Sequence, residues 1–217
     1  MSEYYTWDNI VDIPKKPGIY AWYFSPDLTK YDVERLIDDL NCLRDKTGDK
    51  KAQQKLVIDF LNRNIFDYYS NSPYLAIIEG ALKPTYKGEL EQSMQPSVNL
   101  IDRILDKPDR LKSLRNILRS LHPMFGNPIY LGQSKNLNIR IGDHKKQIQK
   151  YKNQGLYDRD QEDDEANRNT FASEICQRKL PVTRLVVATH VIEYDGGEYI
   201  DIENILNRMY YPIFGRN

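Results

Sequence analysis

Three short segments rich in β-branched and aromatic residues constrain the fold more than any other feature of this chain. They are 18–24 (GIYAWYF), 128–132 (PIYLG) and 181–193, which contains VTRLVVATHVIE. Such side chains favour strands, and turn-forming residues such as Pro17, Pro26 and Gly196 flank these segments. We therefore expect an α/β protein in which a small three-stranded sheet is flanked by helices.

The long interval between the first two strands has the apolar periodicity of helices. From 31 to 44, five apolar residues recur at helical spacing: Val33, Leu36, Ile37, Leu40 and Leu43. Further helices are expected after Lys51, over 98–105 and over 108–121, with an extended segment at 73–91 that turns around Gly80 or Lys83-Pro84. Beyond the second strand, helices are expected over 136–151, 171–178 and 200–211. Residues 1–24 and 126–217 would then form one core, and 25–125 a mostly helical insertion.

Composition narrows the class of protein. Apolar residues make up 40% and charged residues 29% of 217, which is typical of a globular chain. No run of about 18 apolar residues exists, and the N-terminus lacks the basic start and apolar run of a secretory signal. We therefore expect a cytoplasmic protein without a membrane partner. Cys42 and Cys176 are the only cysteines, which indicates two reduced thiols.

The formal net charge is zero, but the charges are unevenly placed. Residues 135–152 carry six basic side chains and one acidic side chain, whereas 158–165 carry six acidic side chains and one Arg. A basic helix is therefore followed by an acidic loop, expected to be a solvated connection. A sharper hypothesis is that the loop shields the helix until DNA binds. Five further basic residues in the insertion recur near helical spacing and are candidates to follow phosphates: Lys107, Arg110, Lys112, Arg115 and Arg119.

Five residues carry the chemistry: Tyr20, Tyr130, Arg140, His144 and Glu203. Arg140 and His144 are four residues apart on one expected helix, so they share a face. That helix follows the strand of Tyr130 through a glycine-containing turn, which points backbone N–H groups toward any bound phosphate. Glu203 lies early in another helix, and a single carboxylate there can hold a divalent ion.

These residues, in this order, resemble the GIY-YIG nuclease superfamily, which includes homing, repair and restriction endonucleases. The resemblance rests on Gly18-Ile19-Tyr20, Tyr130-Leu131-Gly132, the Leu137 to Arg140 to His144 spacing, Glu203 and Pro212, and it spans about half of the chain. It implies a metal-dependent endonuclease that hydrolyses phosphodiester bonds of DNA. Restriction, phage defence and mobile-element biology are the candidate settings.

The resemblance also implies a role for each residue. Glu203 would ligate Mg²⁺ or Mn²⁺, and Arg140 would neutralise the scissile phosphate. Tyr20 would activate or position water, with His144 available as the proton acceptor; the sequence leaves open which of the two is the base. Tyr130 would hydrogen-bond the phosphate or the water around the metal.

The substrate strand is expected to contact Lys135, Lys145, Lys146 and Asn217. The family's Asn normally follows Pro212 more closely than Asn217 does here, and the role is assigned to Asn217 with a shifted loop or is absent. The insertion is the candidate surface for target recognition, a homodimer or a partner protein.

Each residue also has a structural interpretation. The two tyrosines could be ordinary sheet residues, Arg140 part of a solvated face, His144 a surface histidine, and Glu203 an acid stabilised by its helix dipole. The competing hypotheses for function are a catalytically weak nucleic-acid-binding module that acts with a partner protein, and a protein–protein interaction domain that kept only the fold.

Overall fold

The computed structural model divides into two compact units. It describes residues 3–26, 28–69, 74–80, 83–90, 95–122, 125–154, 170–193 and 196–214. The sheet unit comprises Met1–Pro26 and Arg119–Asn217, and the helical unit comprises Asp27–Leu118. None of the helices in the described residues has the length and hydropathy of a membrane span.

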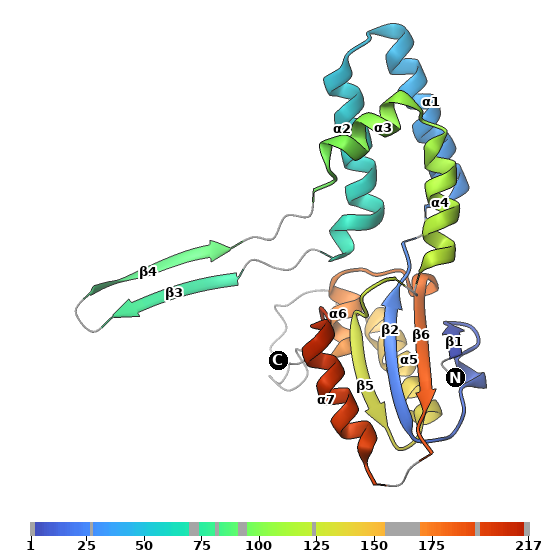
Figure 1. The fold of residues 1–217 in the computed structure, drawn as a ribbon, viewed down its shortest axis with the longest axis vertical. Helices are drawn as coiled ribbons and strands as arrows, with labels where there is room; N and C mark the ends of the chain where they lie inside the picture. The colour runs from blue at the N-terminus through green and yellow to red at the C-terminus, as the bar shows by residue number, and fades with distance from the viewer. Residues whose placement is uncertain are drawn as a thin grey trace. The chain divides into compact units, whose positions relative to one another are not determined.

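The sheet unit is built on a four-stranded antiparallel sheet in the order β1-β6-β2-β5 (Figure 1). Its strands are β1 (Glu3–Thr6), β2 (Gly18–Phe24), β5 (Tyr130–Ser134) and β6 (Leu185–Val191). The three expected strands are confirmed, but the expected number of strands is wrong because β1 pairs with β6 at the edge. Strand β1 has four residues, of which only Tyr5 is buried. A strand this short has no alternation of apolar and polar residues from which it could be predicted.

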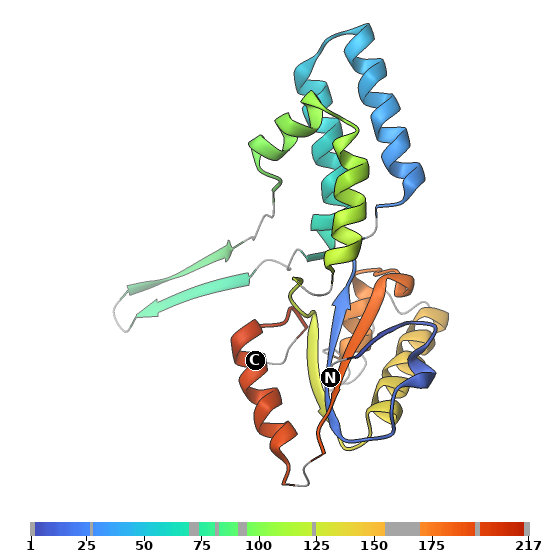
Figure 2. The same cartoon turned by 45° about the vertical axis from the view of Figure 1, so that its right-hand side comes forward.

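Helices lie on both faces of this sheet, as Figures 1 and 2 show. The expected helices are confirmed as α5 (Leu137–Gln154), α6 (Phe171–Gln177) and α7 (Glu198–Tyr210). Successive side chains of β2 point to opposite faces of the sheet. On one face Tyr20 bonds to His144 of α5, and on the other Ile19 packs with Tyr199 and Leu206 of α7. The sheet therefore separates α5 and α6 from α7.

The helical unit contains α1 (Lys30–Lys46), α2 (Lys50–Leu61), α3 (Val98–Asp106) and most of α4 (Arg110–Leu121). Side-chain oxygens of Thr29, Asp49 and Ser97 accept hydrogen bonds from the first backbone N–H groups of α1, α2 and α3, which fixes where these helices begin. The expected hairpin is confirmed as β3 (Tyr74–Gly80) and β4 (Lys83–Leu90), closed by the pairing of Gly80 with Lys83.

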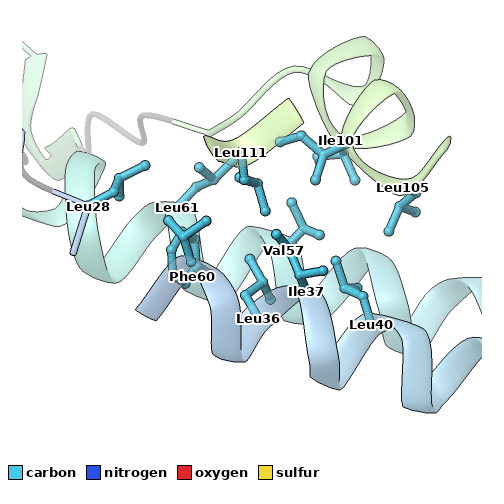
Figure 3. Packing of buried hydrophobic residues seen from close by; sticks show 12 residues of the cluster. Leu28, Leu36, Ile37, Leu40, Val57, Phe60, Leu61, Ile101, Leu105 and Leu111 are labelled. Atoms are coloured by element: carbon cyan, nitrogen blue, oxygen red, sulfur yellow. The ribbon is translucent and has the colours of Figure 1, made fainter. Parts of the chain in front are cut away.

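One apolar cluster holds the helical unit together (Figure 3). Leu36, Ile37 and Leu40 of α1 face side chains of the other three helices, at the spacing expected from the sequence. Those partners are Val57, Phe60 and Leu61 of α2, Ile101, Ile104 and Leu105 of α3, and Leu111 of α4. Leu40, Val57, Ile104 and Leu111 are fully buried, so truncating any one of them to Ala would cost about 2–5 kcal/mol of folding free energy.

Two of the basic residues proposed to follow phosphates are engaged within the helical unit. Arg115 Nε donates to the backbone oxygen of Leu28 at 2.6 Å, and Lys112 pairs with Asp109 at 2.7 Å. Arg115 thus ties α4 to the segment before α1. The five residues are not a uniform row of free cations.

Candidate active site

Two glycines allow Tyr20 to occupy its position in the sheet. In the β2–β5 register Tyr20 lies opposite Gly132, and a Cβ added to Gly132 would lie 2.6 Å from Cζ and Oη of Tyr20. A Cβ on Gly18 would lie 2.2 Å from the backbone oxygen of His190 on β6. The first glycine makes room for the tyrosine ring, and the second lets β2 and β6 approach.

Helix α5 brings Arg140 and His144 to this ring. Ser134 Oγ accepts from the N–H of Asn136, and the Asn136 side chain accepts from the N–H of Ile139, so these two side chains fix the first turn of α5. Leu137 and Ile141 are fully buried against the sheet. This anchoring points the next turn's His144 inward.

The cluster is a chain of hydrogen bonds that runs from a solvent-exposed cation to a buried imidazole. Arg140 Nε donates to the hydroxyl oxygen of Tyr20 at 3.3 Å, and that oxygen lies 2.8 Å from His144 Nε2. The Tyr130 ring centroid lies 6.1 Å from that of Tyr20 and 5.6 Å from that of His144. Tyr20 and His144 are only 1% and 4% exposed, whereas Arg140 is exposed and Tyr130 is half-buried. His144 is therefore not a surface histidine.

Burial keeps both central groups neutral. Desolvation and the neighbouring Tyr130 raise the pKa of Tyr20 well above its ordinary value, against the opposing effect of Arg140. Desolvation, followed by the charge of Arg140, lowers the pKa of His144 to about 3. Near neutral pH the pair is therefore a phenol beside an uncharged imidazole. The other imidazole nitrogen, Nδ1, has no hydrogen-bond partner among the described residues.

Phe171 closes the buried side of the cluster, although no chemical property of this residue singled it out in the sequence. Its ring centroid lies 4.9 Å from that of Tyr130, 5.2 Å from that of His144 and 5.3 Å from that of Trp22. The sequence marked only its structural position: Phe171 follows Thr170, a residue type that caps helices, at the start of α6. The contact with the Phe171 ring adds to the burial that lowers the pKa of His144.

Glu203 lies apart from the other four candidates. It belongs to α7, on the opposite face of the sheet from α5, and its Oε1 accepts a 2.7 Å hydrogen bond from Asn207 Nδ2. Among the described residues, Glu203 makes no hydrogen bond or ion pair with Tyr20, Tyr130, Arg140 or His144. The described ranges also contain no cluster of three His, Cys, Asp or Glu side chains suited to a metal ion.

The basic residues predicted to bind substrate differ in their surroundings. Lys145 donates to the backbone oxygen of Trp7 at 2.7 Å and lies 5.2 Å from the centroid of its ring, so it holds the N-terminal segment to α5. Lys146 is largely exposed and pairs with Asp143 at 3.8 Å, and Lys135 is exposed. Asn217 and the acidic loop at 158–165 lie outside the described residues.

The packing of Tyr20 on Gly132 makes a direct prediction. In a Gly132→Ala variant the methyl group needs the space of the Tyr20 ring, so we expect a loss of about 1–3 kcal/mol in folding free energy and displacement of the hydroxyl from His144. Urea unfolding would measure the first effect. Gly142→Ala is the matched control, because a Cβ at Gly142 meets no atom within 4 Å. Equal stability of the two variants would contradict the close packing.

No protein family model, characterised protein or solved structure gives a significant match to this chain.

Proposed function

We propose that the sheet unit is a nuclease of the GIY-YIG type, which hydrolyses phosphodiester bonds of DNA. The observation that carries the proposal is the hydrogen-bonded series of Arg140, Tyr20 and His144. It combines a cation open to solvent, a hydroxyl and a neutral base within one hydrogen-bond chain. Phosphodiester hydrolysis needs these groups to neutralise a phosphate, to orient water and to accept its proton.

Arg140 is the residue suited to the scissile phosphate. Its guanidinium is exposed, always charged and able to donate two parallel hydrogen bonds to phosphate oxygens. Because one nitrogen already donates to Tyr20, a phosphate bound to the others lies beside the tyrosine hydroxyl. Tyr130 is half-buried and its ring lies beside that of Tyr20, so its hydroxyl is the candidate donor to a second phosphate oxygen.

We assign His144 as the final acceptor of the proton from the attacking water, with Tyr20 as the relay. Tyr20 resists ionisation, so it does not act alone as a base. As water attacks phosphorus and the bond from phosphorus to the leaving oxygen breaks, the water proton passes to the Tyr20 oxygen while the Tyr20 proton passes to His144 Nε2. The leaving oxygen takes a proton from solvent. The low pKa of His144 opposes this transfer in the free protein. A bound phosphate offsets the charge of Arg140, which is the second cause of the low pKa, and so favours the transfer when substrate is present.

Glu203 is the candidate ligand for Mg²⁺ or Mn²⁺. A hard divalent cation prefers carboxylate oxygens, and a single carboxylate leaves the remaining positions to water and phosphate. Glu203 fits this role only in part. Its side chain is half-buried and already accepts from Asn207, and α7 covers the sheet face opposite the Arg140, Tyr20 and His144 series. A metal held by Glu203 alone would therefore lie away from a phosphate bound at Arg140, and the proton transfer through Tyr20 to His144 does not depend on it.

The same observation about Glu203 favours a second candidate function. If the bond to Asn207 persists, Arg140 and Tyr130 would still bind phosphate but Glu203 would hold no metal. The chain would then be a nucleic-acid-binding module that acts with a partner protein. Its zero net charge agrees with a binder whose affinity depends on a partner.

Cleavage of supercoiled plasmid separates the two functions. Wild-type protein with Mg²⁺ or Mn²⁺ is compared with Arg140→Ala and Glu203→Ala, and single-stranded DNA and RNA are tested alongside. Matched controls are Lys150→Ala on α5 and Asp201→Asn on α7, both exposed. We expect nicking that Arg140→Ala loses and the controls keep; loss of nicking in Glu203→Ala as well would assign the metal to Glu203. Shifted mobility of the plasmid without cleavage, for every metal and nucleic acid, favours the binding module.

A further inference from the structure

A cavity opens on the sheet face opposite the Tyr20–His144 pair. Its volume is about 350 Å³, within the range of about 300–1,000 Å³ that is usual for small-ligand sites. It lies over β1, β6 and β2 and against α7. The residues that line it include Ala21, Ala188, Tyr4, Tyr23 and Tyr210.

The strand register explains why the sheet is hollow here. Tyr4 of β1 lies opposite Ala188 of β6, which lies opposite Ala21 of β2, which in turn lies opposite Leu131 of β5. The two central positions of this row carry only a methyl group, and large side chains stand at both ends. Helix α7 adds Leu206 and Tyr210 at one side. The floor is therefore two alanines.

The walls are aromatic and uncharged. Tyr4, Tyr23, Tyr210 and Phe125 come from β1, β2, α7 and the segment before β5. Tyr4, Tyr23 and Tyr210 bring three phenol groups to one cavity. Burial raises the pKa of Tyr23, and the nearby Tyr4 and Tyr210 raise it further. Among the described residues that line the cavity, none is Asp, Glu, Lys or Arg.

This combination matches one class of ligand. A ring on a flat methyl floor between aromatic walls gains stacking and apolar contact, as bases do on the sheet surfaces of single-strand-binding proteins. The tyrosine hydroxyls and Asn127 supply hydrogen bonds for the edge of a heterocycle. Apart from the imidazole of His190, no ionisable nitrogen or carboxylate among the lining residues offsets a charge on the ligand, which favours an uncharged group.

We propose that this cavity binds an unpaired nucleobase, so that the protein holds a single-stranded or flipped-out nucleotide on the face opposite its Tyr20–His144 pair. The identity of the ligand rests on the proposed nuclease function, whereas the shape and chemistry of the cavity do not. A proline-rich peptide is the competing occupant of an aromatic groove.

Titration with free nucleosides tests the cavity without any cleavage. Full-length protein in EDTA is titrated with thymidine and with adenosine, and amide chemical shifts are followed. We expect saturable binding with shifts at the backbone of Ala21, Ala188 and Tyr23. Ala188→Leu fills the floor and Tyr23→Leu removes a ring, and each should weaken binding about 10-fold or more. Tyr31→Leu, an exposed tyrosine on α1, is the matched control.

The outcomes separate this inference from the proposed nuclease function. Absence of nucleoside binding, equal binding by Ala188→Leu and wild type, or binding only of a proline-rich peptide overturns the nucleobase site. Nucleoside binding by a protein that cleaves no nucleic acid would support the cavity and overturn the nuclease. Thermal melting of Ala188→Leu near the wild-type temperature shows that its fold is intact.

Discussion

Replacing Tyr20 with phenylalanine should slow phosphodiester cleavage by about 100-fold or more, since one positioned proton-transfer group contributes roughly 10²–10⁴-fold. The substitution removes only the hydroxyl that joins Arg140 to His144 and leaves the buried ring on Gly132. Single-turnover nicking of supercoiled plasmid measures the effect.

Tyr5→Phe is the control for removal of a largely buried hydroxyl in the same sheet. The hydroxyl of Tyr5 bonds to Glu3 on β1 and not to Arg140 or His144. Its rate should remain close to that of the wild type. Equal rates for Tyr20→Phe and Tyr5→Phe would exclude Tyr20 from proton transfer.

Acid should destabilise the sheet unit through His144. Its pKa is near 3 in the folded protein and near 6.5 in the unfolded chain, so the unfolded state binds the proton first as the pH falls. This contribution to stability is complete above about pH 6.5 and declines below it, by about 1.4 kcal/mol for each pH unit. Between pH 6.5 and 4.5 the loss should be about 2 kcal/mol.

Urea unfolding of wild type and His144→Gln at pH 7.5 and 4.5 measures this contribution of His144 to the folding free energy. The difference between the two proteins isolates His144 from other groups, including His122, whose pKa is also lowered by burial. We expect the variant to lose less stability on acidification than the wild type. Parallel curves for the two proteins would mean that His144 is not held neutral by burial.

Local patterns in the sequence predicted what depends on neighbours along the chain. The four-residue step from Arg140 to His144 fixes a shared helix face, and the strand segments around Tyr20 and Tyr130 fix the faces of a sheet. The expected fold therefore predicted that these four side chains lie close together. The roles of Gly18 and Gly132 in that approach became clear only from the strand register.

Contacts between segments far apart in the chain could not be predicted from the sequence. Phe171 shields His144 because α6 packs beside α5, and Lys145 is held by Trp7, which precedes it by 138 residues. Glu203 was grouped with the other candidates by order along the chain, but order does not determine which face of the sheet its helix covers. Glu203 and Asn207 are four residues apart on one helix, so the spacing in the sequence already indicated that their side chains are neighbours.

The central claim is that Arg140, Tyr20 and His144 act together as one phosphodiesterase site. A double-mutant cycle tests it most directly, with single-turnover nicking rates measured for wild type, Arg140→Ala, Tyr20→Phe and the double variant. We predict that the double variant is about as slow as the slower single variant, because either change breaks the same hydrogen-bonded series. Losses that multiply, or a wild-type protein that cleaves no nucleic acid with Mg²⁺ or Mn²⁺, would contradict the claim.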